Sequence, residues 1–139
     1  MPDPKALWIG PYHAPLRRDT GLTGRRFGLD FICMANATID PAEVEKFSAL
    51  AAEWWNPKGA FGALHRMNPV RLQYVRDLAA EHFGVSGAKP LAGLGVLDLG
   101  CGGGLVSAPL ARMGAKVTAI DASEEAIGAA RAYASQAGL

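Results

Sequence analysis

Cysteine is scarce in this 139-residue sequence: only Cys33 and Cys101 occur, and they lie far apart. Neither belongs to a Cys-x-x-Cys pair or to a cluster with histidine, so the sequence predicts neither a disulfide nor a zinc site. The sequence also lacks any run of about 18 consecutive apolar residues, the length that a membrane-spanning helix requires. We therefore expect a protein without a membrane span that works in a reducing, cytoplasmic compartment.

An excess of charge of one sign is also absent, because 14 Lys and Arg against 13 Asp and Glu give a formal net charge of +1. Domains that hold nucleic-acid phosphates usually carry a clear basic excess, so we expect no nucleic-acid partner. Hydrophobic residues make up 50% of the chain and charged residues 19%. This composition is typical of a globular domain with an apolar core rather than of a disordered tail.

The chain divides into three segments of different pattern. Residues 1–35 show neither helical periodicity nor alternation and contain scattered glycine and proline, which predicts an irregular N-terminal extension. They lack the apolar run of a secretory signal, and a start of translation at Met34 is an open alternative. Residues 36–90 form a helical segment, and residues 91–139 alternate between strand and helix patterns.

Two helices are expected in the helical segment. The first begins at Asp40, which is followed by a proline and a capping-box acid, and it ends at residues 56–59. The second is predicted to begin at Asn68-Pro69 and to end at Gly84, which places Arg71 in its first turn. A cation there opposes the helix dipole at a cost of about 0.3–1 kcal/mol, and a bound anion would reverse this penalty. An exposed arginine lying over the helix is the alternative.

A strand-helix-strand unit follows, with strands predicted at GVLDLG and KVTAID and a helix at residues 105–113. The first turn of such a unit commonly holds an anionic or nucleotide ligand. The dinucleotide pattern Gly-x-Gly-x-x-Gly fails here, because Leu105 stands where its last glycine should be. The residues that do form a regular pattern are an acid, alternating glycines and the acid that ends the second strand: Asp98, Gly100, Gly102, Gly104 and Asp121.

This pattern resembles the first two motifs of class I S-adenosylmethionine-dependent methyltransferases. The resemblance implies that the loop at Gly100 and Gly102, with Asp98 beside it, packs against the methionine part of the cofactor. It also implies that Asp121 accepts hydrogen bonds from both ribose hydroxyls, which suits a carboxylate with two acceptor oxygens. A nicotinamide or flavin site and a turn without a ligand are the alternatives. From the residues themselves, we expect Asp98 to tie down the amides of the loop.

The segment before the loop carries a second signature: Trp54-Trp55, Gly59-Ala60-Phe61 and Leu64-His65-Arg66-Met67-Asn68-Pro69-Val70-Arg71. This combination is similar to the O-methyltransferases of ubiquinone biosynthesis, and the resemblance covers about residues 36–139. It implies that Arg71 binds the cofactor, with the methionyl carboxylate as the obvious partner. The tryptophan pair is expected to pack, His65 to form a local hydrogen bond, and Cys101 to be a small packed thiol.

The resemblance implies an α/β fold, namely the N-terminal part of a Rossmann-like methyltransferase domain preceded by two helices. The implied reaction is methyl transfer from S-adenosylmethionine to a phenolic hydroxyl of a polyprenylated catechol-type precursor, with help from a divalent cation. Such a substrate implies peripheral contact with the inner membrane or with other ubiquinone-biosynthesis proteins. No metal-binding residue and no catalytic residue is assigned.

Only two strands are expected in this chain, where the family has about seven, so the sequence is interpreted as part of such an enzyme. Alone, it should bind the cofactor weakly and transfer no methyl group. Its exposed sheet edge would also favour aggregation or pairing. Three alternatives remain open: a cofactor-binding remnant without activity, a partner chain of a split methyltransferase, and another small-molecule methyltransferase.

Overall fold

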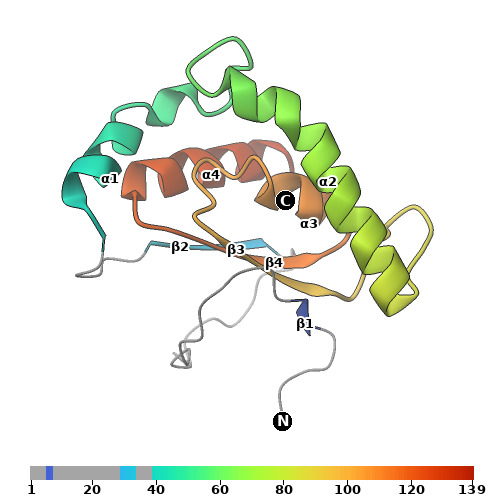
Figure 1. Cartoon of the computed structure of the whole chain (residues 1–139). Coiled ribbons are helices and arrows are strands. Elements are labelled where there is room, and N and C mark those ends of the chain that lie inside the picture. Colours follow the sequence, from blue (N-terminus) through green and yellow to red (C-terminus); the bar gives the residue numbers. More distant parts are fainter. Residues whose placement is uncertain (1–5, 8–28, 34–38) are drawn as a thin grey trace, which may run out of the picture.

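The computed structural model describes residues 6–7, 29–33 and 39–139, and Figure 1 shows their arrangement. A four-stranded parallel sheet has the order β1-β3-β4-β2, with β1 at Ala6–Leu7, β2 at Leu29–Cys33, β3 at Gly95–Leu99 and β4 at Lys116–Asp121. The central pair, β3 and β4, is joined through a helix, as parallel neighbours require. The predicted α/β fold is therefore confirmed, and both predicted strands lie where the sequence placed them.

Two of the four strands were not predicted. The five residues of β2 pair along β4 from Leu29 opposite Val117 to Cys33 opposite Asp121, and β1 pairs with the start of β3. The expectation of only two strands is thus wrong for the described residues. The run Leu29–Cys33 is short and apolar, and its pairing satisfies backbone groups of β4 that would otherwise face no partner. Most of the predicted irregular extension lies outside the described residues.

The described helices lie on one side of this sheet (Figure 1). They are α1 at Pro41–Ser48, α2 at Gly62–Phe83, α3 at Ser107–Arg112 and α4 at Glu124–Gln136, with a short 3-10 turn, η1, at Ala51–Glu53. The predicted N-cap at Asp40 is confirmed, since its side chain accepts from the amide of Ala42, and Ser123 caps α4 in the same way by accepting from the amide of Ala126. The first helix ends earlier than predicted, at Ser48. In the part of the chain that the structure describes, none of the helices is long and apolar enough to cross a membrane.

The start of the second helix was predicted wrongly. Helix α2 begins at Gly62, six residues before the predicted start, and Pro69 lies inside it. A proline removes one helical hydrogen bond. The neighbouring Asn68 is buried, and its side-chain amide donates to the backbone carbonyl of Leu105, which holds this part of α2 in place. The predicted end is confirmed, because Gly84 adopts a left-handed conformation with φ of 64°.

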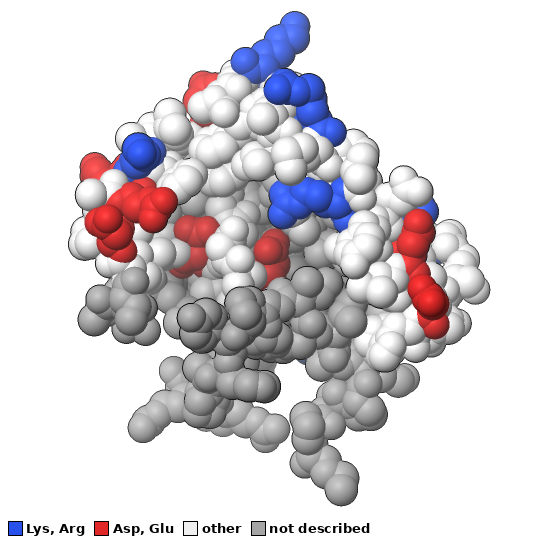
Figure 2. Space-filling view, viewed as in Figure 1, with Lys and Arg blue, Asp and Glu red and all other residues white. Residues whose placement is uncertain are grey.

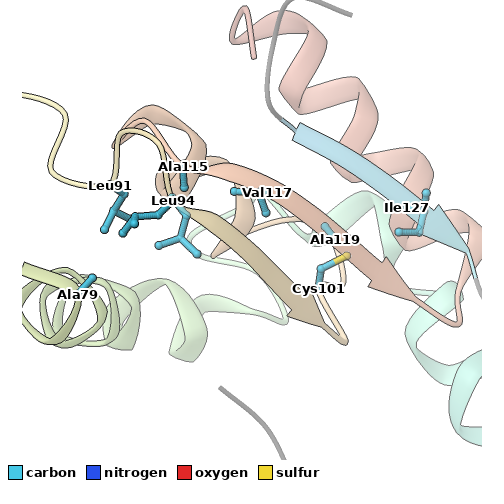
Figure 3. Packing of buried hydrophobic residues seen from close by; sticks show 9 residues of the cluster. Ala79, Leu91, Leu94, Cys101, Ala115, Val117, Ala119 and Ile127 are labelled. Atoms are coloured by element: carbon cyan, nitrogen blue, oxygen red, sulfur yellow. The ribbon is translucent and has the colours of Figure 1, made fainter. Parts of the chain in front are cut away.

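The core lies between the sheet and the helices. In Figure 3, Val117 and Ala119 of β4 point toward the side chains of the surrounding helices and loops, among them Ile127 of α4 and Leu94. Both strand residues are completely buried. A second buried cluster contains Trp54, Phe61, Leu105 and Ala126. This second cluster fastens the segment before α2 onto the glycine turn and α4.

Candidate functional site

The glycine turn after β3 lies at the carboxyl ends of the two central strands, where ligands bind in open α/β sheets. Its alternating glycines, Gly100, Gly102 and Gly104, all have positive φ values of 75°, 51° and 84°. Residues with a side chain adopt this conformation at a cost, which explains the glycine at each of these positions. The amides of Gly100 and Cys101 both donate to the carbonyl of Ile120, which fastens the turn to β4.

Asp121 ends β4 and holds the turn in place. One carboxylate oxygen accepts from the amide of Gly102 at 2.7 Å, and the other accepts from the amide of Ser123 at 2.9 Å. The sequence assigned the anchoring of the loop amides to Asp98, so this part of the prediction is wrong and the function belongs to Asp121. Since each carboxylate oxygen offers about two acceptor positions, the fixed carboxylate retains capacity for further donors.

Asp98 lies near the end of β3 and accepts from the hydroxyl of Ser107 on α3 instead of from loop amides. Burial raises the pKa of the Asp98 carboxyl above its ordinary value of 3.8. The hydroxyl of Ser107 and the charge of Arg71 lower this pKa in part, and the charge of Asp121 raises it. The two acids therefore lie close enough to influence each other on either side of the turn.

Arg71 lies in the middle of α2, not in its first turn, because α2 begins at Gly62. The predicted conflict between Arg71 and the helix dipole is therefore wrong. Its side chain is exposed, and its positive charge acts on Asp98 at the end of β3. Figure 2 shows acidic side chains recessed in this face, with basic side chains above them on the side of α2. The structure thus brings Arg71, Asp98 and the glycine turn to one region.

The space around the turn differs sharply between its glycines. A Cβ atom built on Gly100 would meet no atom of the described residues within 4 Å, whereas one on Gly102 would lie 2.3 Å from the ring of Trp54. The turn is consequently open at Gly100 and covered at Gly102. Asp98 near the end of β3 and Asp121 at the end of β4 place two carboxylates beside this exposed glycine.

Two residues that could suggest catalysis have structural contacts instead. The Cys101 thiol is buried, and burial together with the charges of Asp98 and Asp121 raises its pKa to about 12. A thiol of this kind is not a nucleophile at neutral pH, which confirms its predicted packing role. The ring of His65 forms a hydrogen bond of 2.9 Å with the carbonyl of Trp54, which confirms the predicted local contact.

Sequence reasoning missed two residues. The hydroxyl of Ser107 donates to Asp98, and the side-chain amide of Asn68 donates to the carbonyl of Leu105. Neither belongs to the glycine pattern, and only the folded chain brings them to the turn. For the described residues, no group of three or more His, Cys, Asp or Glu side chains could hold a metal ion. No residue of the site is therefore assigned to a metal.

The raised pKa of Asp98 makes stability depend on pH in a defined direction. The folded chain holds this proton more tightly than the unfolded chain, so the contribution of Asp98 is complete below pH 3.8 and is lost as the pH rises through the folded-state pKa. Between pH 3.8 and the folded-state pKa, each pH unit lowers the free energy of unfolding by about 1.4 kcal/mol. We expect Asp98→Asn to lack this loss in urea unfolding measured over a pH series. A constant difference between the variant and the original chain at every pH would contradict this.

Comparison with known proteins agrees with the geometry of the turn. Residues 96–139 match a family model described as a methyltransferase domain. The chain is 58% identical over 107 residues to the ubiquinone biosynthesis O-methyltransferase of Rhizobium leguminosarum bv. trifolii, and 57% identical over 107 residues to that of Sinorhizobium medicae. It is 55% identical over 102 residues to the enzyme of the same name from Maricaulis maris.

These alignments cover 76%, 76% and 73% of this chain but only 42%, 43% and 40% of the relatives. The chain thus spans about two fifths of the length of the curated relatives it matches, as expected for a sequence that corresponds to part of such an enzyme. The resemblance inferred from the glycine turn and the tryptophan segment is confirmed. The chain thus carries a methyltransferase-domain sequence at residues 96–139 and is a relative, over about two fifths of their length, of the ubiquinone biosynthesis O-methyltransferases.

Proposed function

We propose that the chain binds S-adenosylmethionine at the glycine turn and contributes this site to an O-methyltransferase. The observation that carries the proposal is the placement of the strand-end acids Asp98 and Asp121 at a glycine turn, where no described residue lies within 4 Å of a Cβ atom at Gly100. The family match of residues 96–139 supports the choice of cofactor.

The residues of the turn suit the ends of this cofactor. Asp121 is held by two amides, so its remaining acceptor positions are already oriented for the two ribose hydroxyls before the cofactor arrives. Arg71 supplies an exposed positive charge near Asp98, which suits the methionyl carboxylate. When bound, S-adenosylmethionine supplies an electrophilic methyl group on its sulfonium. The chain's own contribution is to bind and orient this molecule, which is a large part of catalysis in a displacement.

We propose a phenolic hydroxyl of a polyprenylated ubiquinone precursor as the methyl acceptor. The support is the name of the relatives, which are 55–58% identical to this chain. An acceptor with such a tail would bring the protein to a bilayer surface. The divalent cation implied by the resemblance has no assigned ligand in the described part of this chain, so no step depends on it.

Equilibrium dialysis of the 139-residue chain with labelled S-adenosylmethionine tests the proposal. We expect weak but saturable binding, competition by S-adenosylhomocysteine and no competition by NAD. We expect no methyl transfer to a catechol by this chain alone, since it spans about two fifths of its relatives' length. Equal competition by NAD would indicate a dinucleotide site and contradict the proposal, as would an absence of S-adenosylmethionine binding.

A further inference from the structure

Gly103 poses a question that the alternating glycine pattern leaves open. It occupies a position between the patterned glycines, and unlike Gly102 and Gly104 its φ is not positive. Its backbone conformation therefore does not require glycine. A Cβ atom at this position would instead lie 2.3 Å from Cγ and 2.4 Å from Cβ of Trp54. The side chain of Trp54 thus explains why residue 103 is glycine.

Trp54 is held through both its ring and its backbone carbonyl. Its side chain is 8% exposed and is stacked on Phe61, with ring centroids 3.8 Å apart and an angle of 3° between the planes. Its carbonyl forms a hydrogen bond with the ring of His65. The ring covering Gly102 and Gly103 is therefore part of a packed unit, and not a loose side chain resting on the surface.

Trp55 reaches the same glycine from another direction. Its indole Nε1 donates to the carbonyl of Gly103 at 2.9 Å. The ring is stacked on Tyr133 of α4, with centroids 3.3 Å apart, and the hydroxyl of Tyr133 accepts from Arg112 of α3 at 2.7 Å. The ring of Trp55 thereby packs on α4 while its indole nitrogen bonds to the turn.

We propose that Trp54 and Trp55 are positioning residues that fix the cofactor turn by holding Gly103. Trp54 sets the position of the Cα atom of Gly103 by contact, and Trp55 sets the direction of the Gly103 carbonyl by a hydrogen bond. Both act between the patterned residues Gly102, whose amide donates to Asp121, and Gly104. This assigns to the tryptophan pair more than the packing role that its sequence alone predicts. The inference rests on the proposed cofactor site for its effect on binding, but not for its effect on the turn.

The first test replaces Trp55 by phenylalanine, which keeps an aromatic ring for Tyr133 and loses the indole donor. We expect amide hydrogen exchange at Gly102 and Gly104 to become about fivefold faster and S-adenosylmethionine binding about fivefold weaker, as for the loss of one net hydrogen bond. Tyr133→Phe is the matched control. It keeps the ring on which Trp55 is stacked and removes only the hydroxyl that bonds to Arg112, so we expect unchanged exchange at both glycines and unchanged binding.

A second test replaces Gly103 by alanine and compares it with Gly128→Ala in α4, where a Cβ atom meets no described residue within 4 Å. We expect faster exchange in the turn only for Gly103→Ala. If Trp55→Phe and Gly103→Ala both leave the exchange of Gly102 and Gly104 unchanged, the positioning role is wrong, whatever the cofactor does. If the original chain binds no S-adenosylmethionine, the proposed function fails, and the exchange data still decide the role of the tryptophans.

Discussion

Asp121→Asn is expected to weaken the binding of S-adenosylmethionine by about 100-fold. The carboxylate of Asp121 accepts from two backbone amides and is proposed to accept from two ribose hydroxyls as well. Hydrogen bonds to a charged group contribute about 1.5–3 kcal/mol each, and an asparagine turns an NH2 group toward donors that need an acceptor. The substitution therefore loses cofactor contacts and also loosens the turn at Gly102.

Asp77→Asn is the matched control for this experiment. It removes the same negative charge from an exposed position on α2, where Asp77 pairs with the neighbouring Arg76. Because S-adenosylmethionine carries a cationic sulfonium, the control separates a general loss of attraction from the loss of a specific contact. We expect Asp77→Asn to bind as the original chain does in equilibrium dialysis. Binding by Asp121→Asn within twofold of the original chain would show that Asp121 does not hold the cofactor.

The central part of the site was predictable from the sequence because its residues depend on local backbone geometry. Both strands around the turn are short apolar runs, and the alternating glycines mark positions that require positive φ. Asp121 ends a strand whose neighbour ends at the turn, so its proximity to the turn follows from a parallel strand pair. These features need only a strand-helix-strand unit, which the chain specifies within 27 residues, from residue 95 to residue 121.

The remaining features depend on contacts between distant segments. Asn68-Pro69 is a typical helix start, yet α2 continues through it because Asn68 donates to Leu105, 37 residues further along the chain. Strand β2 is similarly defined by its partner β4 and not by a turn or repeat near it. The anchoring of the turn by Asp121 instead of Asp98 has the same cause, since Asp98 accepts its hydrogen bond from Ser107 on α3. No local pattern could have indicated these pairings.

Gly100→Ala is expected to lose cofactor binding and Gly102→Ala to lose stability, although both glycines have positive φ. Each alanine carries a conformational cost of about 1–2 kcal/mol. At Gly102 the new methyl group also meets the ring of Trp54 at 2.3 Å, where overpacking adds about 1–3 kcal/mol. At Gly100 it meets no described residue within 4 Å and enters the space proposed for the cofactor. We therefore expect Gly100→Ala to remain folded without binding, and Gly102→Ala to lose much of its stability.

Gly93→Ala provides the control that separates strain from function, because Gly93 has φ of 80° and free space like Gly100 but lies before β3. In thermal unfolding we expect Gly93→Ala and Gly100→Ala to lower Tm equally, by about 5 °C, and Gly102→Ala by about 10 °C or more. In equilibrium dialysis, only Gly93→Ala should bind S-adenosylmethionine like the original chain. Equal stability of Gly102→Ala and Gly93→Ala would contradict the contact with Trp54. Undiminished binding by Gly100→Ala would place the cofactor elsewhere, because a methyl group in the proposed space would then obstruct nothing.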